Sequence, residues 1–340
     1  MVGSAGPNGP AKAGPAPVVA LLGPTAAGKS RIAFEVASAS STVELVSVDS
    51  MAVYRGMDIG TAKATGHERA QVPYHLLDLV EPSEEYTVQQ FQAEAGRALA
   101  GIAARNHAAL LVGGTGLYLR AVTDGLAFPG RYPDIAESLA DGLDASGPEG
   151  SGERRSAREA MHRRLALLDP VAAGRVEPSN QRRLVRALEV TLGSGRPFSS
   201  FGPGLDRFPP TSVAMVGISH QPAALDERIA SRFARLMELG FLEEVRSLAA
   251  RPGGMSRTAR QALGYRELLA HLEGGLPLQS AVEAAVQRTR SQARRQMAWF
   301  RRDPRIVWLD PDDEPVAPIT ALCAGDSPDG VAVGDWHTTQ

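Results

Sequence analysis

The segment that decides the fold is residues 18–30, which read VVALLGPTAAGKS. Its first five residues form a continuous apolar run of strand length, and a glycine-rich turn and an apolar-periodic segment from Arg31 follow at once. Strand, glycine-rich turn and helix in this order are typical of the first βα unit of a parallel sheet. The predicted fold class is therefore α/β: a P-loop NTPase-like parallel sheet with flanking helices, to which a small all-helical insertion domain and C-terminal helices are added.

Residues 23–30 match the phosphate-loop pattern G-x-x-x-x-G-K-[ST] in full. The glycines let the backbone curl so that several N–H groups converge on phosphate oxygens. The following helix adds its positive end, Lys29 adds a point charge, and Ser30 can ligate Mg²⁺, the expected cofactor. A chance match is the alternative, and the strand and helix on either side argue against it. The predicted diphosphate- or nucleotide-binding residues are Gly23, Pro24, Thr25, Ala26, Ala27, Gly28, Lys29 and Ser30.

The rest of the chain continues this α/β pattern. Further apolar runs predict strands at 43–48, 108–112 and 213–218, and helical spacing predicts helices at 88–105 and 225–248, the latter interrupted at Gly240. Between them lies a stretch rich in Ala, Arg and Glu, which indicates a helical insertion followed by a helix at 180–192. The predicted organisation is a disordered tail (1–16), a P-loop core (17–125), a helical insertion domain (126–180), a core continuation that ends in basic helices (181–310) and a disordered acidic tail (311–340).

Length and composition limit the class of protein. A chain of 340 residues has room for one large α/β unit and a smaller domain. No run of 18 apolar residues occurs, so we expect no membrane partner. The single cysteine, Cys323, excludes an internal disulfide and a cysteine metal cluster, which fits a reducing cytoplasm. A cytoplasmic monomer is the expectation.

The net charge of −2 conceals a strongly basic segment near the C-terminus. Residues 286–305 contain seven arginines and one acid, whereas six acids and no Lys or Arg follow Asp310. A capping box at 280–283 predicts a helix that runs to about residue 302. Two arginine rows beside an apolar stripe on this helix favour a nucleic-acid phosphate-binding surface over a solvated face with intrahelical ion pairs, because acids are scarce after Glu283. The rows are Arg288, Arg295 and Arg302, and Arg290, Arg294 and Arg301.

Two further motifs follow predicted strands and should face the phosphate loop, because ligands of parallel sheets bind at the carboxyl ends of the strands. Asp49 ends the second strand and has three possible roles: a water-mediated Mg²⁺ contact, acceptance of a proton from a nucleophile, or capping of the next turn. The run 113–116 (GGTG) ends another strand, and the Thr115 hydroxyl can donate to a ligand oxygen. It lacks the strand-end acid of an NTP hydrolase, which weakens an ATPase assignment.

Taken together, these motifs resemble the tRNA dimethylallyltransferase family (IPP transferases) over about residues 16–310. The resemblance is carried by GPTAAGKS (23–30), SVDSMAVYRGMDIGTAK (47–63), HLLDLVEPSEEYTVQQF (75–91), LVGGTGLYL (111–119), QRRLVRALEV (181–190), QALGYRELL (261–269) and RRQMAWFRR (294–302). The resemblance implies transfer of a dimethylallyl group from dimethylallyl diphosphate, held by the phosphate loop, to N6 of adenosine 37 of tRNA. Diphosphate is released.

The resemblance also implies roles for individual residues. Asp49 would contact the adenine amine as base or acceptor, Thr115 would bond the oxygen that bridges prenyl carbon and diphosphate, and Arg232 would reach the diphosphate, with Arg228 as a competing candidate. The residues that would touch tRNA are Asp49, Ser50, Met51, Ala52, Thr115, Arg182, Arg183, Arg186, Gln261, Gly264, Tyr265, Arg266, Arg294, Arg295, Trp299 and Arg301. Trp299 and Tyr265 are candidates for stacking on bases, and Trp299 is equally a core candidate.

Three positions depart from the family pattern, and three other functions remain to be weighed. Ala52 stands where Gln is usual, Asn180 where Asp is usual, and Ala136 where an arginine contacts tRNA, for which Arg131 is a candidate replacement. A P-loop kinase or NTPase would explain 23–30 but not the run 47–63. A transferase acting on free AMP would not explain the basic helix. An RNA-binding scaffold without catalytic activity would not explain the intact set of site residues.

Overall fold

The computed structural model describes residues 16–202, 204–312 and 314–326, and it divides into two compact units, Met1–Asp124 with Pro209–Gln340 and Gly125–Phe208. Within the described residues, one sheet has the order β3-β2-β4-β1-β5-β6, and all its neighbours pair in parallel. The predicted α/β fold with a parallel sheet is confirmed. The strands are β1 Val18–Leu22, β2 Val43–Val48, β3 Tyr74–His75, β4 Ala108–Gly113, β5 Ala214–Ile218 and β6 Ile306–Leu309.

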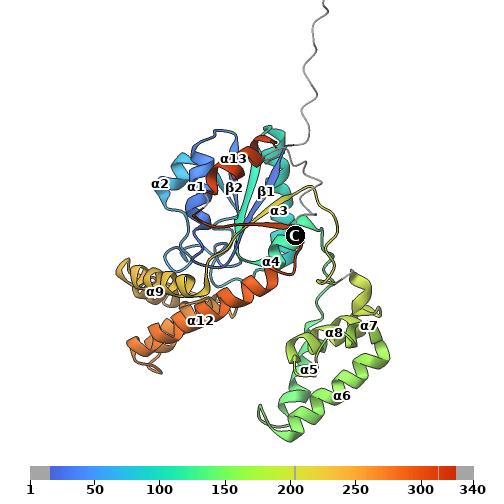
Figure 1. Cartoon of the computed structure of the whole chain (residues 1–340). Helices are drawn as coiled ribbons and strands as arrows, with labels where there is room; N and C mark the ends of the chain where they lie inside the picture. The colour runs from blue at the N-terminus through green and yellow to red at the C-terminus, as the bar shows by residue number, and fades with distance from the viewer. Residues whose placement is uncertain (1–15, 203, 313, 327–340) are drawn as a thin grey trace, which may run out of the picture. The chain divides into compact units, whose positions relative to one another are not determined.

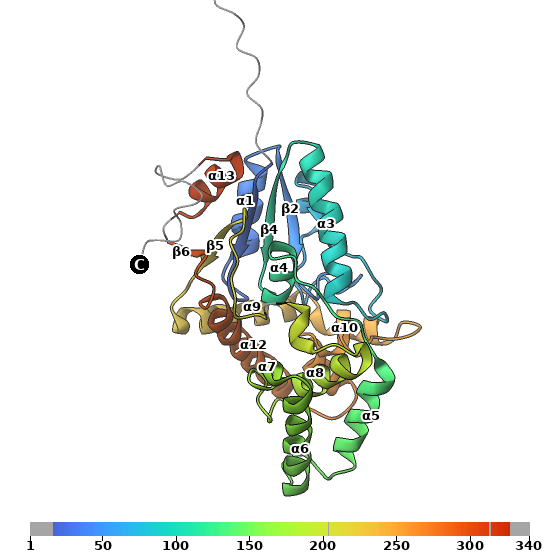
Figure 2. The same ribbon diagram turned by 90° about the vertical axis from the view of Figure 1, so that its right-hand side faces the viewer.

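Different helices bury the two faces of the sheet (Figures 1 and 2). Ala20 and Leu22 of β1 pack into a core with residues of α3, α4 and α9–α12, whereas Val19 and Leu21 pack with α1 and α13. Both faces are covered, which is why the strands are continuous apolar runs. The helices of this unit are α1 Lys29–Ser38, α2 Gly66–Gln71, α3 Val88–Ala104, α4 Gly116–Thr123, α9 Pro222–Glu238, α10 Phe241–Ala249, α11 Tyr265–Leu272, α12 Leu278–Phe300 and α13 Val316–Ala324, with a 3₁₀ turn at Ala259–Gln261.

The strand ends are aligned in register at the carboxyl edge of the sheet. Gly113 of β4 lies opposite Val48 of β2 on one side and Leu22 of β1 on the other. A Cβ at Gly113 would lie 2.0 Å from the carbonyl oxygen of Val48, so only glycine permits this approach. The segments that leave these three strands therefore start side by side.

The segment that leaves β2 is fixed by two charged side chains. Glu244 of α10 accepts hydrogen bonds from the backbone N–H groups of Asp58, Ile59 and Gly60, at 2.9, 2.6 and 3.0 Å. The buried ammonium of Lys63 donates to the carbonyl of Tyr54 and to the carboxylates of Asp58 and Asp78, at 2.8, 2.7 and 2.7 Å. The long run 47–63 is thus the sequence of one rigid loop at the edge of the sheet.

The second unit, Gly125–Phe208, is helical, as expected, but it extends beyond the predicted boundary at residue 180. The apolar face of α8, with Leu184 and Leu188, is buried against Leu165 and Ala172 of the same unit, so α8 belongs here and not to the core. Its elements are α5 Pro133–Asp144, α6 Gly152–Leu168, α7 Pro170–Ala173, α8 Gln181–Ser194 and a 3₁₀ turn at Phe198–Phe201.

Other predicted boundaries meet different outcomes. The predicted amphipathic helix at 225–248 divides into α9 and α10 at Gly240, whose φ is 95°. The capping box at 280–283 is wrong: α12 starts at Leu278 after an extended Pro277, so Ser280 lies inside the helix. The predicted disorder of 311–340 is wrong for α13, which packs Ile319 and Leu322 against the sheet face that α1 covers. Residues 1–15 and 327–340 of the predicted tails lie outside the described residues.

Candidate active site

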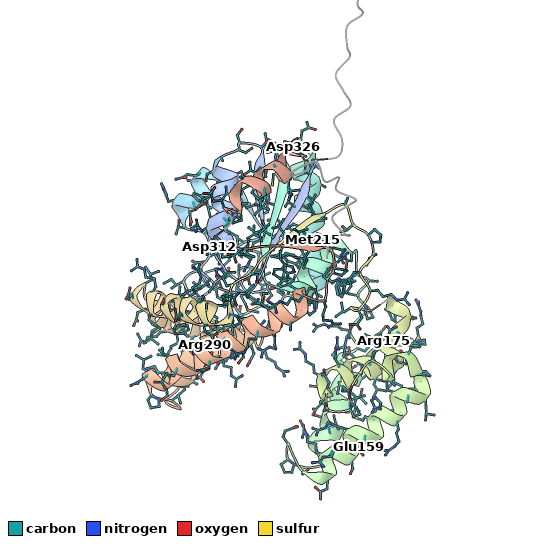
Figure 3. All side chains as sticks on the ribbon, viewed as in Figure 1. Glu159, Arg175, Met215, Arg290, Asp312 and Asp326 are labelled. Carbon is teal, nitrogen blue, oxygen red and sulfur yellow. The ribbon has the colours of Figure 1, made fainter. Side chains whose placement is uncertain are left out.

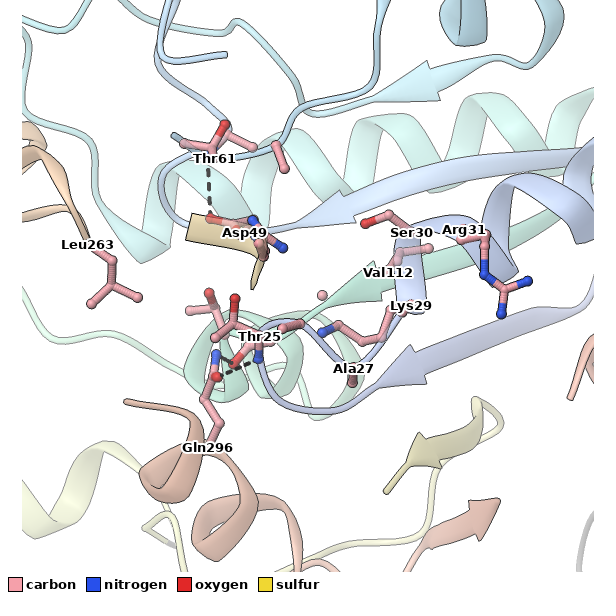
Figure 4. A pocket seen from close by; sticks show the side chains of 18 of the residues that line it. Thr25, Ala27, Lys29, Ser30, Arg31, Asp49, Thr61, Val112, Leu263 and Gln296 are labelled. Atoms are coloured by element: carbon pink, nitrogen blue, oxygen red, sulfur yellow. Dashed lines mark hydrogen bonds between the residues drawn. The ribbon is translucent and has the colours of Figure 1, made fainter. Parts of the chain in front are cut away.

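A cavity of about 1220 Å³ opens at the carboxyl edge of the sheet (Figure 4). Residues of the phosphate loop, of the turns that follow β2 and β4, and of helices α9 and α12 line it. This is the position at which open α/β sheets bind ligands. The lining includes Asp49, Thr115 and Arg232 together with Thr25–Ser30 of the loop. Of the predicted loop residues, Gly23 and Pro24 are not part of the lining.

Two side chains outside the phosphate loop fix it by contacting its backbone carbonyl oxygens. Arg228 of α9 donates to the carbonyl of Ala26 at 3.0 Å, and the His220 ring nitrogen Nε2 lies 3.0 Å from the carbonyl of Ala27. Ala26 and Gly28 adopt positive φ angles of 64° and 89°. Alternating backbone conformations of this kind turn successive N–H groups to one side, which forms an anion-binding concavity.

Arg232 and Arg228, which the sequence left as competing candidates, have different positions. Arg228 contacts the loop backbone, whereas Arg232 lines the cavity. There Arg232 is close enough to Lys29 to lower the pKa of the amine, and close enough to Asp49 for the carboxylate to act on the pKa of Arg232. Burial lowers the pKa of Arg232, and the Asp49 carboxylate opposes that shift. The geometry therefore favours Arg232 as the arginine that faces a bound ligand.

Lys29 is buried and its ammonium donates to the carbonyl of Pro24 at 2.7 Å. Burial and, to a lesser extent, the neighbouring Arg232 guanidinium lower the pKa of Lys29, Asp49 opposes them, and the net result is a pKa of about 7. Desolvation and a like charge both disfavour the charged amine. An anion in the cavity would reverse this electrostatic imbalance, so the site is arranged for a negatively charged ligand.

Asp49 has a capping role and a free oxygen. Its Oδ1 accepts hydrogen bonds from the backbone N–H groups of Met51 and Ala52, at 2.7 and 3.4 Å. Its Oδ2 makes no hydrogen bond to the described part of the chain. The cap and the chemical role therefore do not exclude each other, because the turn fixes one oxygen and leaves the other for a ligand in the cavity.

Thr115 is placed at the start of α4, opposite the Asp49 turn. Its hydroxyl oxygen accepts the backbone N–H of Ser50 at 3.4 Å and makes no capping bond to α4. Since that contact uses a lone pair, the hydroxyl proton stays available for donation to a ligand oxygen. Asp49 and Thr115 are thus joined through a single peptide unit.

Gln296 is a site residue that sequence reasoning missed. Its side chain lies in the cavity lining and hydrogen-bonds to both the phosphate loop and the turn after β4 (Figure 4). One signal was available: Gln296 falls on the apolar stripe of α12, three residues after Ala293 and four before Phe300, where a polar side chain needs a buried partner.

The structure corrects several of the predicted tRNA contacts. The ring of Tyr265 is fully buried and its hydroxyl donates to Glu244 at 2.6 Å, so it cannot stack on a base. Gly264 is buried as well, where a Cβ would lie 2.6 Å from Phe241. Trp299 packs against Gly116 and the edge of Phe300, so the ring takes the alternative role of a core residue.

The arginines of α12, of which Figure 3 labels Arg290, divide into two groups. Arg288 pairs with Glu267 of α11, and Arg290 and the more exposed Arg294 lie against Asp226 of α9, so these pairs join helices. These are not the intrahelical pairs that the scarcity of acids after Glu283 disfavours, because the acids come from neighbouring helices. The exposed residues for which tRNA contact stays a prediction are Gln261, Arg266, Arg294, Arg295 and Arg301 in this unit and Arg182 and Arg183 in the helical unit.

The remaining predicted tRNA contacts lie in less exposed positions. Ser50 and Met51 are half-buried beside Asp49, and Ala52 is buried. In the helical unit, Arg186 donates to Glu189 and to the carbonyl of Pro129, at 2.6 and 2.8 Å, so it stabilises that unit. None of the described helices is long and apolar enough to cross a membrane.

The fold and site define an α/β enzyme with a parallel sheet, in which an acid and a hydroxyl lie in one cavity with the loop 23–30. A family model for IPP transferase matches residues 52–303. Similar curated proteins include the tRNA dimethylallyltransferases of Desulforudis audaxviator, 43% identical over 300 residues (88% of this chain, 93% of that protein), and Streptomyces coelicolor, 45% identical over 296 residues (87% and 91%). This chain belongs to the IPP transferase family.

Solved structures agree with this assignment. The full-length tRNA isopentenylpyrophosphate transferase from Bacillus halodurans matches with a TM-score of 0.63 and 33% identity, over 91% of this chain and 96% of that one. A eukaryotic dimethylallyltransferase acting on tRNA matches with a TM-score of 0.71 over 92% of this chain and 81% of that one; at 23% identity it supports the fold alone.

We expect binding of inorganic diphosphate to take up a proton at Lys29 near pH 8. In the free protein the pKa of Lys29 is about 7, so the amine is mostly neutral at pH 8, and a bound diphosphate favours the charged form. Affinity should therefore be highest below pH 7 and fall as pH rises through that pKa, by up to about tenfold per pH unit. Calorimetric titration in buffers of different ionisation enthalpy measures the proton uptake.

Lys29→Met provides the matched control for this titration. Methionine retains a long side chain but cannot bind a proton, and protonation of diphosphate itself is common to both proteins. Equal proton uptake by the variant and the wild type would show that Lys29 does not titrate with the ligand.

Proposed function

We propose that this protein transfers the dimethylallyl group from dimethylallyl diphosphate to N6 of adenosine 37 in tRNA and releases diphosphate. The observation that carries the proposal is the meeting of Asp49, Thr115 and Lys29 in one cavity of an IPP transferase fold. In the reaction the adenine nitrogen bonds to the allylic carbon, the carbon–oxygen bond breaks with its electron pair going to diphosphate, and the nitrogen loses one proton. Several relatives are named for this activity.

The leaving-group end of the site is built for a diphosphate. As the carbon–oxygen bond breaks, negative charge gathers on the departing oxygens, and donors already aimed at them lower the barrier without reorganisation. Lys29, Arg232 and the N–H groups of the loop face this position. The Thr115 hydroxyl would donate to the bridging oxygen, because accepting the Ser50 N–H uses only one lone pair and leaves its proton available.

The nucleophile end is the free oxygen of Asp49. An adenine amine is a weak nucleophile because its lone pair is delocalised into the ring. A placed carboxylate that accepts its proton contributes typically about 10²- to 10⁴-fold in rate. Since Oδ1 is fixed by the turn at Met51, Oδ2 presents a constant direction to the amine. The adenine reaches this depth when it is flipped out of the RNA stack.

Mg²⁺ is part of the proposal as a companion of the diphosphate. Ser30 has an exposed hydroxyl at the start of α1, beside Lys29, which is the position from which this loop type contacts Mg²⁺. Among the described residues there is no cluster of three His, Cys, Asp or Glu side chains that would hold a metal without a ligand. Ser30 would therefore supply one oxygen, and the ion would neutralise charge on the diphosphate.

The RNA side of the proposal rests on exposed arginines. Arg294, Arg295 and Arg301 lie on the outer surface of α12 near its C-terminal end, and Arg295 also lines the cavity. Exposed guanidinium groups beside the opening of the site suit the phosphates of a folded RNA. We further propose that the protein acts as a monomer in the cytoplasm, a compartment that its single cysteine, Cys323, suits.

The function is tested by supplying labelled dimethylallyl diphosphate with unmodified tRNA or with AMP. We expect the label in tRNA, at N6 of adenosine 37 after nucleoside analysis, without a need for ATP. Transfer to AMP but not to tRNA would show that free AMP is the acceptor. ATP turnover without RNA would contradict the proposed function and indicate an NTPase.

Variants of Asp49 and Thr115 separate the two ends of the reaction in single-turnover assays. Thr115→Ala should lower the rate by about 10- to 100-fold, since a hydrogen bond to a charged group is worth roughly 1.5–3 kcal/mol. Thr115→Ser keeps the hydroxyl and should recover most of the loss. Asp49→Asn should be nearly as slow as Asp49→Ala if proton transfer contributes. A Thr115→Ser variant as slow as Thr115→Ala would remove the hydroxyl from the mechanism.

Replacing Arg294, Arg295 and Arg301 by Ala should weaken tRNA binding and flatten its salt dependence. Each lost phosphate contact removes about 0.7–0.9 from the slope of log affinity against log salt concentration. Filter binding at several salt concentrations measures the slope, and diphosphate affinity should be nearly unchanged. Arg235→Ala on α9, an exposed arginine paired with Glu238, is the matched control. An unaltered slope in the triple variant would show that these arginines of α12 do not contact the RNA phosphates.

A further inference from the structure

The side chain of Gln296 connects two parts of the site that are far apart in sequence. Its Oε1 accepts the backbone N–H of Thr25 at 2.9 Å, and its Nε2 donates to the carbonyl of Gly114 at 2.9 Å (Figure 4). Thr25 belongs to the phosphate loop, and Gly114 immediately precedes Thr115. A single carboxamide on α12 therefore bridges the diphosphate cradle and the turn that carries the hydroxyl.

Both bonds depend on a carboxamide in one orientation. A donor is required toward Gly114 and an acceptor toward Thr25, which fixes the two ends of the amide. Gly114 leaves room for this contact, since a Cβ there would lie 2.5 Å from Nε2. Three residues further along α12, Trp299 packs on Gly116, where a Cβ would lie 2.3 Å from the indole ring. Gln296 and Trp299 together hold the start of α4 against α12.

We propose that Gln296 is a positioning residue that sets the Thr115 hydroxyl relative to the phosphate loop. It acts through Gly114 and Thr25 and does not itself need to touch the donor. Without it, a half-buried N–H and a carbonyl lose their partners, and the two segments are free to separate. Misplacement of a reacting group by about 1 Å costs on the order of 10²-fold in rate. The catalytic part of this inference rests on the proposed function; the structural bridge does not.

The proposal also gives α12 a second task. The helix that presents Arg294, Arg295 and Arg301 at its surface also contacts the phosphate loop through Gln296. A shift of α12 would therefore move the loop and Thr115 together, and the distance between the cradle and the hydroxyl would be preserved.

The bridge itself is tested by hydrogen exchange of the Thr25 amide, measured by NMR. Gln296→Ala and Gln296→Met should both speed exchange at Thr25, because each removes the acceptor. Methionine keeps the length and helix preference of the side chain, so it serves if the alanine variant folds poorly. Gln287→Ala, at an exposed position on the same helix, should leave the exchange unchanged. Unchanged exchange in both Gln296 variants would overturn the bridge, whatever the enzyme catalyses.

The catalytic consequence is tested by a double-mutant cycle in single-turnover transfer. Gln296→Ala should lower the rate by about 10- to 100-fold, with affinity for inorganic diphosphate within about threefold of wild type. Because Gln296 acts through Thr115, the double variant Gln296→Ala with Thr115→Ala should be within about twofold of Thr115→Ala alone. Losses that multiply in the double variant, or a Gln296→Ala rate equal to that of Gln287→Ala, would overturn the positioning role. Absence of transfer by the wild type would refute the proposed function instead, and the Thr25 exchange would still decide the bridge.

Discussion

The site depends on the register in which three parallel strands end. Val48, Gly113 and Leu22 lie side by side, and the close approach of β2 and β4 requires that residue 113 has no side chain. Asp49, Thr115 and the phosphate loop leave these strands within one or two residues. A slip of one residue would turn Asp49 and its neighbours to the opposite face, because side chains alternate along a strand. The strand register thus places Asp49, Thr115 and the phosphate loop next to one another independently of any side-chain contact.

Electrostatic cost is concentrated where the ligand would bind. Burial disfavours the charge of both Lys29 and Arg232, and the Arg232 guanidinium further disfavours the charge of Lys29, with Asp49 as a partial counter-ion to both. A bound diphosphate would attract both cations and offset the cost of burying them. The free protein is therefore less stable at this site, and the cations are already in place for the ligand without rearrangement. The stabilising interactions lie elsewhere, for example where Lys63 is enclosed by two carboxylates and a carbonyl.

The sequence was sufficient for what local patterns determine. The strands at 43–48 and 108–112 and the loop at 23–30 follow from apolar runs and glycine spacing, and these alone bring Asp49 and Thr115 to one edge. What failed depended on partners that are distant in the chain. In the sequence Tyr265 is a candidate for base stacking, and only the structure shows that its hydroxyl bonds to Glu244. Likewise the sequence assigns α8 to the core, and only the structure shows that it packs on Leu165. Gln296 has partners 271 and 182 residues away, which no local pattern contains.

Two of the three departures from the family pattern, Ala52 and Asn180, concern positions where the backbone or a related side chain still performs the local task. Ala52 is buried, and it is its N–H that bonds to Asp49, so loss of the usual glutamine leaves the Asp49 turn intact. Asn180 caps α8 by accepting the N–H of Arg183 at 3.2 Å; Asn and Asp are equivalent as caps, although only Asp adds a charge to the helix dipole. Removing that negative charge leaves the exposed Arg183 less neutralised. The substitution thus preserves the helix and makes its start more attractive to a phosphate.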